Sequence, residues 1–236
     1  IESTRKAVKG TVDPLNMGGV VGDTLTFGDG SGAVIYDVYN AGTIGDDEFN
    51  YLGRHVGGVV GRLGGTLEKA YNTGDIYNGY SVTGGVVGYW LSGSITNVFN
   101  TGNITVVNKD VHALNSLVGG LVGAVNVKPY DFKGQADGYY VKKLSYGYNL
   151  GTIRSFIPHD ALKGEFSLPG GDTEERYNLN IVSGILGGAT EFVEYTNNQD
   201  YSQTKTVEID NVYTTGNIYT AREETQGQYT KDTVNA

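Results

Sequence analysis

The amino-acid sequence predicts an all-β protein, a parallel β-helix (β-solenoid) of about five rungs with insertions. Three observations predict this fold. A ten-residue motif occurs five times, a glycine-rich pentapeptide precedes each copy, and the composition favours short strands joined by tight turns. The 236 residues include 37 Gly and 18 Tyr but only 4 Pro. Val, Thr, Ile and Tyr favour strands, and the shortage of Pro argues against a disordered linker.

The ten-residue motif reads aliphatic, two variable residues, small apolar, aromatic, Asn, any residue, Gly, any residue, Ile. Its copies start at Ile35, Leu67, Ile95, Leu144 and Ile209. The fifth copy has Thr214 where the others have Asn. A unit this short cannot bury its own apolar face, whereas stacked units bury a continuous one. We therefore expect neighbouring copies to pair as parallel strands about 4.8 Å apart.

Stacking predicts a role for each repeated position of the motif. The first aliphatic residues should form one buried column and the small apolar residues a second. The final isoleucines should form a third column: Ile44, Ile76, Ile104, Ile153 and Ile218. The Asn side chains should bond to one another or to the turn backbone, as side-chain ladders do in stacked β-structures. The motif glycine is expected to supply a positive φ at the corner.

The glycine-rich pentapeptide marks where each repeat begins. It occupies residues 18–22, 57–61, 84–88 and 119–123, with a weaker copy at 183–187. The start-to-start spacings are 39, 27, 35 and 64, so the 27-residue spacing is the bare repeat and longer ones contain insertions. The insertions are predicted at 126–143, 154–182 and 189–206. The chain is predicted to form one β-helix domain over 1–236, with repeats from about 18 to 218 and capping or linker segments at its ends.

Composition and charge exclude several classes of protein. The net charge is -9 and Lys and Arg do not cluster, so no nucleic-acid partner is expected. No apolar run approaches the roughly 18 residues of a membrane helix, so no membrane insertion is expected. The chain has no Cys, which excludes disulfides, thiol catalysis and Cys-zinc sites, and no cofactor is predicted. The first residue is Ile, which suggests a piece of a longer polypeptide.

The two best copies of the repeat resemble a known family. Residues 57–76 read GGVVGRLGGTLEKAYNTGDI, and residues 84–104 read GGVVGYWLSGSITNVFNTGNI. Both are similar to the GLUG repeat, and GGLVG at 119–123 with YNLGTI at 148–153 is a split match. The resemblance implies a bacterial exoprotein, either a filamentous-haemagglutinin-like adhesin or the non-catalytic part of an immunoglobulin A protease. It therefore implies a bacterial cell-surface or secreted location, and it carries no catalytic residues.

One insertion is the candidate ligand-binding site. Residues 126–143 hold several aromatic side chains beside positive charges: Tyr130, Phe132, Tyr139, Tyr140, Lys142 and Lys143. Aromatic rings offer large contact areas for a sugar ring or a protein. The expected partner is a host or bacterial surface glycan or protein. The alternative interpretation is that these aromatics pack as a lid on the outer face of the coil.

The leading prediction is a non-catalytic structural or binding segment of an adhesin-type exoprotein. One alternative is a carbohydrate-active β-helix enzyme, a lyase or hydrolase. Its candidate groups lie in the second insertion: Arg154, His159, Asp160, Glu165, Asp172, Glu174, Glu175 and Arg176. Solvated loop charge explains the same residues. Another alternative is a non-catalytic module of a secreted protease. Residues 27–32 lack the spacing of known calcium loops, and the carboxylates of residues 45–48 are interpreted as a solvated turn, so no metal site is predicted.

Overall fold

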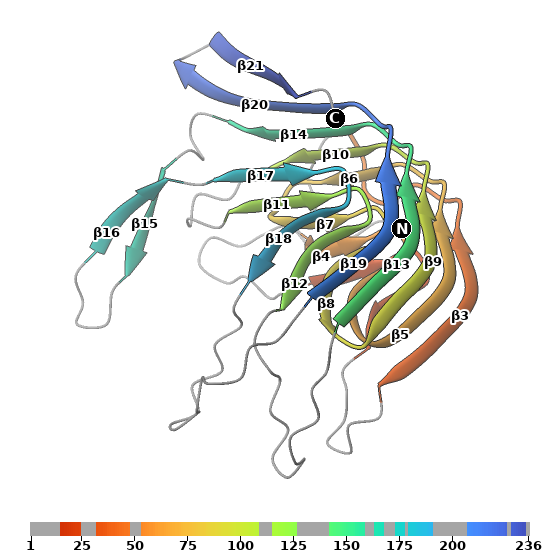
Figure 1. Ribbon diagram of the computed structural model, residues 1–236. Helices are drawn as coiled ribbons and strands as arrows, with labels where there is room; N and C mark the ends of the chain where they lie inside the picture. The colour runs from red at the N-terminus through yellow and green to blue at the C-terminus, as the bar shows by residue number, and fades with distance from the viewer. Residues whose placement is uncertain are drawn as a thin grey trace.

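The chain is all-β over the residues that its structure, a computed structural model, describes. Those residues are 15–24, 32–47, 53–108, 115–126, 142–158, 163–167, 173–177, 179–190, 207–225 and 228–234. They contain strands, turns and bends but no helix. Most of the strands lie in parallel sheets that curl around a shared core like half of a barrel (Figure 1). Accordingly, no helix long and apolar enough to cross a membrane occurs in this described part.

The sheets form four walls, in each of which neighbouring repeats pair in parallel. Wall 1 contains β1 (Leu15–Gly18), β4 (Gly53–Gly57), β7 (Val82–Gly84), β11 (Ser116–Gly119) and β17 (Asn180–Ser183). Wall 2 contains β2 (Val21–Asp23), the first part of β5 (Val60–Asn72), β8 (Val87–Ser92), β12 (Val122–Asn126) and β18 (Leu186–Thr190). Wall 3 contains β3 (Ala33–Asn40), the second part of β5, β9 (Ser94–Asn100), β13 (Lys142–Asn149) and β19 (Val207–Thr214). Because β5 runs through both, walls 2 and 3 are one nine-stranded sheet.

Wall 4 is the last wall of each repeat, and among the described strands of the walls it carries the one that pairs antiparallel. It contains β6 (Ile76–Asn78), β10 (Ile104–Val107), β14 (Ile153–Ile157) and β20 (Ile218–Thr225). The first repeat adds only a parallel bridge from Ile44 to Ile76. The last strand, β21 (Gln228–Val234), pairs antiparallel with β20. Five repeats therefore pass through the walls in the same order: 15–47, 53–78, 82–108, 116–157 and 180–225, named repeats 1 to 5 below.

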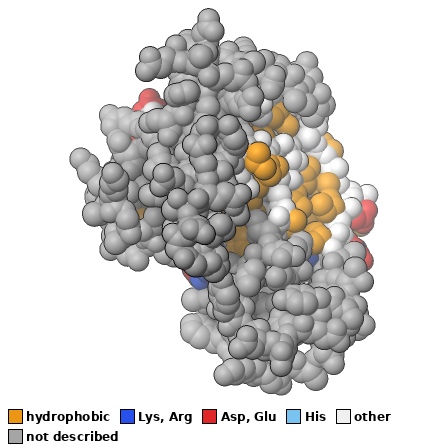
Figure 2. All heavy atoms as spheres, turned by 90° about the vertical axis from the view of Figure 1, so that its left-hand side faces the viewer, with side chains coloured by type: hydrophobic (Ala, Val, Ile, Leu, Met, Phe, Trp, Pro, Cys, Tyr) orange, Lys and Arg blue, Asp and Glu red, His pale blue; other side chains and the backbone are white. Residues whose placement is uncertain are grey.

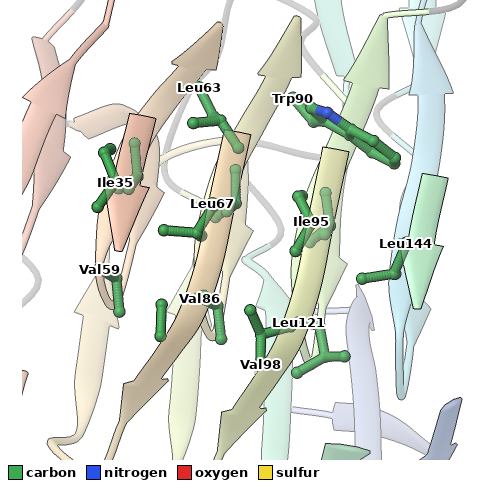
Figure 3. Close-up of a cluster of buried hydrophobic side chains, with 14 of the residues drawn as sticks. Ile35, Val59, Leu63, Leu67, Val86, Trp90, Ile95, Val98, Leu121 and Leu144 are labelled. Carbon is green, nitrogen blue, oxygen red and sulfur yellow. The ribbon is translucent and has the colours of Figure 1, made fainter. Parts of the chain in front are cut away.

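The three predicted columns are stacked in register. In the isoleucine column each member pairs with the next, and all five are at most 6% exposed. In the first column Ile35, Leu67, Ile95 and Leu144 lie on adjacent strands and face Val59, Val86 and Leu121 across the core (Figure 3). Burying each such side chain contributes about 1.5–3 kcal/mol. The prediction is confirmed for the isoleucine column.

Ile209 is the exception in the first column. Its backbone has the expected register with Leu144, but its side chain is 45% exposed. It lies on β19, the last strand of wall 3, which pairs with only one strand among the described residues. The prediction of burial is wrong at this position because the residue stands at the end of the stack.

The glycines serve close approach between repeats. No motif glycine has a positive φ, so that prediction is wrong. A Cβ on Gly102, a motif glycine, would lie 2.0 Å from the carbonyl oxygen of Gly74 in the neighbouring repeat. A Cβ on Gly85, in the pentapeptide, would lie 2.1 Å from the Gly120 oxygen and 2.6 Å from Cγ of Asn100. Glycine is required at these corners because the backbones stack without room for a side chain.

The insertions are shorter at their edges than the sequence predicts. Lys142 and Lys143, expected in the first insertion, belong to β13. Residues 153–157 form β14, and residues 180–183 form β17, so strands take both ends of the second insertion. Between those two strands, the described elements form an antiparallel hairpin of β15 (Lys163–Ser167) and β16 (Thr173–Tyr177). Residues 191–206 of the third insertion lie outside the described residues.

Candidate functional site

The predicted ligand-binding residues fall into two groups. Tyr130, Phe132, Tyr139 and Tyr140 lie outside the described residues. Lys142 and Lys143 are the first two residues of β13 and alternate across wall 3. The Lys142 side chain is 5% exposed, whereas Lys143 is exposed on the outer face. Of the two lysines, Lys143 is therefore the one placed to meet a partner.

The residues of the alternative enzyme hypothesis are only partly described. Arg154 is exposed on β14, with its guanidinium 5.4 Å from the centre of the Tyr219 ring on the next strand. Backbone pairing in the β15–β16 hairpin places Glu165 opposite Glu175. His159, Asp160 and Asp172 lie outside the described residues. In the described part of the chain no three His, Cys, Asp or Glu side chains gather as metal ligands would.

A ladder of stacked aromatic rings runs along the outer face of wall 3. It comes from the fifth motif position in all five repeats: Tyr39, Tyr71, Phe99, Tyr148 and Tyr213. Successive ring centres are 4.6 to 5.3 Å apart, and the planes are within 16° of parallel. The motif shows an aromatic in every copy, but the stacking follows only from the in-register pairing of the strands.

The aromatic ladder presents ring edges rather than ring faces. Each inner ring has both faces covered by its neighbours, so a sugar could stack flat only on an end ring. The end rings, Tyr39 and Tyr213, are 61% and 54% exposed. Two more tyrosines beside the ladder, Tyr36 and Tyr146, are also half exposed. The outer face of wall 3 thus offers tyrosine edges and hydroxyl groups along the stack.

The Asn ladder lies on the inner side of the same strands. Asn40, Asn72, Asn100 and Asn149 each donate from Nδ2 to the side chain of the next repeat, and Thr214 accepts the last bond. Each Nδ2 also donates to the carbonyl of its own motif glycine. Asn72, Asn100 and Asn149 are fully buried, so these bonds satisfy groups that would otherwise be costly to bury. The predicted ladder is confirmed.

A cluster of polar side chains lies on the outer side of walls 1 and 2, near repeat 1. Arg62 donates from Nε to Asp23, 3.0 Å away, and Asn16 Nδ2 donates to the same carboxylate at 2.7 Å. His55 Nδ1 lies 2.7 Å from Asn16 Oδ1, and its ring stacks on Tyr89. Burial, with the nearby Arg54 and Arg62 charges, lowers the His55 pKa to about 3. The imidazole is therefore neutral at pH 7, in contact with Asn16 and Tyr89.

The described surface has apolar and polar areas side by side. Figure 2 shows hydrophobic side chains gathered among uncharged groups on one face, with charged side chains at the margins. Comparisons with family models, curated proteins and solved structures found no match to this chain. The resemblance to the GLUG repeat family therefore stays a prediction, and the fold and exposed groups are the basis for a functional proposal.

Proposed function

We propose that the chain is a parallel β-helix of about five rungs and a non-catalytic structural or binding segment of a bacterial surface or secreted adhesin-type protein. The observation that carries the proposal is the pair of ladders, one of Asn and one of aromatic rings, in the same register. The two ladders and the buried columns together account for nearly every repeated position of the motif as part of the stack. We therefore propose that any binding uses the outward side chains and the insertions.

The proposed partner is a surface glycan or protein that contacts aromatic side chains. Tyr36 and Tyr146 offer exposed rings on wall 3, and Lys143 lies on the same face. Tyrosine gives a large amphipathic contact for little loss of rotamer entropy. The aromatic residues of the insertion that precedes β13 are the second proposed contact, as the sequence predicts.

The β-helix itself is testable with an engineered disulfide, because the chain has no Cys. Lys143 and Glu208 are register partners on neighbouring repeats. Lys143→Cys with Glu208→Cys should oxidise readily and stabilise the fold by about 4 kcal/mol on the chain-entropy account of disulfides. The control, Lys143→Cys with Asp210→Cys, is two residues out of register and should oxidise slowly. Equal rates for the two pairs would contradict the in-register stack.

Binding is tested on glycan arrays and on host cells with the purified chain. Two variants of matched chemistry divide the proposed contacts. One carries Tyr130→Ala, Tyr139→Ala and Tyr140→Ala, and the other carries Tyr36→Ala and Tyr146→Ala. Loss of binding in one variant locates the contact on the insertion or on wall 3. Unchanged binding by both folded variants would overturn the aromatic contact, and no binding by the wild type would overturn the adhesin role and leave only a structural segment.

A further inference from the structure

Among the described residues, the stack of repeats ends in strands that are paired on one side only. In wall 3, β3 and β19 each pair with only one strand of the described chain, and β1, β17, β2 and β18 do so in walls 1 and 2. Exposure rises at these ends. Ile209 is 45% exposed, whereas Leu67, Ile95 and Leu144 in the same column are fully buried. At the N-terminal end Val20 is 43% exposed, whereas Val59 and Val86 at the same repeat position are fully buried. Ile35 there is only 9% exposed, so each end exposes part of the apolar surface that the inner repeats bury.

The two ends of wall 3 are complementary to each other. Extending the register by one step places Ile209 over Ile35, Val212 over Val38, and Tyr213 over Tyr39. These are the pairings that already join the inner repeats. No like charges meet along the step, since Asn211 would face Asp37 and Asp210 would face Tyr36. A second copy would thus repeat an interface that this chain forms four times within itself.

The direction of the Asn ladder selects head-to-tail stacking. All its bonds point from the N-terminal repeat toward the C-terminal one. At the start Asn40 Oδ1 receives its own turn's Gly42 N–H, whereas in the inner repeats this oxygen receives the preceding Asn. At the other end Thr214 accepts from Asn149 and, among the described residues, has no acceptor for its own hydroxyl hydrogen. Thr214 of one copy can donate to Asn40 of another, whereas two N-terminal ends would oppose acceptors.

In the described part of the chain, one strand would block this contact between copies. β21 pairs with β20 from Ile218 to Thr225 and occupies the place in wall 4 that a following repeat would take. The region around Ile44 in a second copy would need that place. β21 is a single antiparallel strand, whereas the joint would cover the ends of four walls. Covering an edge strand is a recognised way to prevent association.

We propose that β21 caps the stack and that its displacement lets the C-terminal end bind the N-terminal end of a second copy, head to tail. The interface is heterologous and does not close, so it generates open chains of copies. The proposal depends on the register of the described strands and not on the adhesin role. Failure of glycan or cell binding would therefore leave it standing.

The cap is released in the full-length chain by Thr230→Pro with Lys231→Pro. Adjacent prolines remove a backbone donor on each side of β21, so one of them interrupts pairing with β20. Sedimentation velocity should show the wild type as a single small species and the cap-released chain as a concentration-dependent series of larger ones. Adding Tyr39→Lys blocks the N-terminal end, and adding Tyr213→Lys blocks the C-terminal end. Each blocked chain alone should remain a monomer.

Mixing the two blocked chains is the decisive step. The chain with Tyr39→Lys keeps an intact C-terminal end, and the chain with Tyr213→Lys keeps an intact N-terminal end. The mixture should therefore form dimers and no larger species. Dimers of one blocked chain alone would indicate a symmetric joint and overturn head-to-tail stacking. A folded cap-released chain that stays monomeric, with its circular dichroism and thermal unfolding retained, would overturn the proposal.

A cross-linking measurement keeps the proposal testable if the proline variant does not fold. Val34 and Glu208 occupy the same exposed register position in repeats 1 and 5. Val34→Cys and Glu208→Cys chains of different mass are mixed in the wild-type background under oxidising conditions, where transient opening of β21 suffices. The mixed disulfide should exceed both homodimers several-fold. A statistical mixture of the three dimers would contradict head-to-tail stacking.

Discussion

One residue in each repeat has a left-handed backbone conformation. It explains how motif residues three positions apart can both face the core within a β-strand. The third motif residue has φ between 52° and 55° in all five copies: Asp37, Lys69, Asn97, Tyr146 and Asn211. In a regular strand, residues three apart point to opposite faces. The left-handed residue changes that alternation, so Ile95, Val98 and Asn100 of repeat 3 are all buried while Asn97 is exposed. The register of neighbouring strands omits this residue.

At the left-handed position we expect the usual preference of β-strands for Val over Asn to be reversed. Asn tolerates this conformation and Val does not. Tyr146→Asn should stabilise the fold by up to about 1 kcal/mol, and Tyr146→Val should destabilise it by about 1 kcal/mol. At Lys143, an exposed strand residue without positive φ, Val should be the better of the two. Urea unfolding measures both pairs, and the same order at the two sites would contradict the backbone explanation.

His55 makes the stability of the fold depend on pH. Burial lowers its pKa to about 3 in the folded chain, whereas the unfolded chain exposes the ring and restores the ordinary histidine pKa of 6.5. The unfolded state therefore binds more protons between these values, and stability falls as pH decreases from 6.5 toward 3. Between pH 7 and pH 4 the loss due to His55 should be roughly 3 kcal/mol. The free energy of unfolding of His55→Gln should lack this part of the pH dependence. If it decreased with pH as steeply as that of the wild type, the prediction would be wrong.

At the scale of the elements, the walls and the insertions have different tasks. The walls repeat with one register, and the connections between walls 4 and 1 vary in length. Between β6 and β7 only residues 79–81 connect these walls, whereas β14 and β17 are separated by residues 158–179. The short connection shows that three residues are enough to join wall 4 of one repeat to wall 1 of the next.

This difference predicts that the second insertion is dispensable for folding. Replacing residues 159–178 by a Gly-Ser-Gly linker should leave cooperative thermal unfolding and change the free energy of unfolding by less than about 1 kcal/mol, since loop closure depends weakly on length. Calorimetry provides the measurement. A control deletion that also removes β14 should abolish folding, because Ile153 and Ile157 are buried in wall 4. Loss of folding in both deletions would place the insertion in the core.

At the scale of the whole molecule, position along the stack determines how much a residue matters. Among the described residues, inner repeats are covered on both sides, whereas the end repeats are covered on one side in walls 1 to 3. In repeat proteins each unit contacts only its neighbours. Asn100 is fully buried in repeat 3, whereas Asn40 in repeat 1 is partly exposed, although both have the same motif position and donate the same two kinds of bond.

The position effect is testable with two alanine substitutions. Asn100→Ala leaves the Asn72 donor and the Gly102 carbonyl without their partner in a buried site, and should cost roughly 2–4 kcal/mol. Asn40→Ala removes the same side chain from the end of the ladder and should cost about 1 kcal/mol. The free energies of unfolding decide it. Equal losses at the two positions would mean that the ladder is not a one-dimensional stack.

The sequence by itself determined the repeat, the parallel register, the buried isoleucine column and the Asn ladder. These follow from motif positions that recur at a fixed spacing, because equal units stack with equal contacts. Only the tertiary structure decided why the motif glycines are required, where the left-handed residues lie and how exposed Ile209 is. Those features depend on how closely the backbones of neighbouring repeats approach and on which repeat ends the stack. The residue order within a single repeat does not specify these distances between repeats.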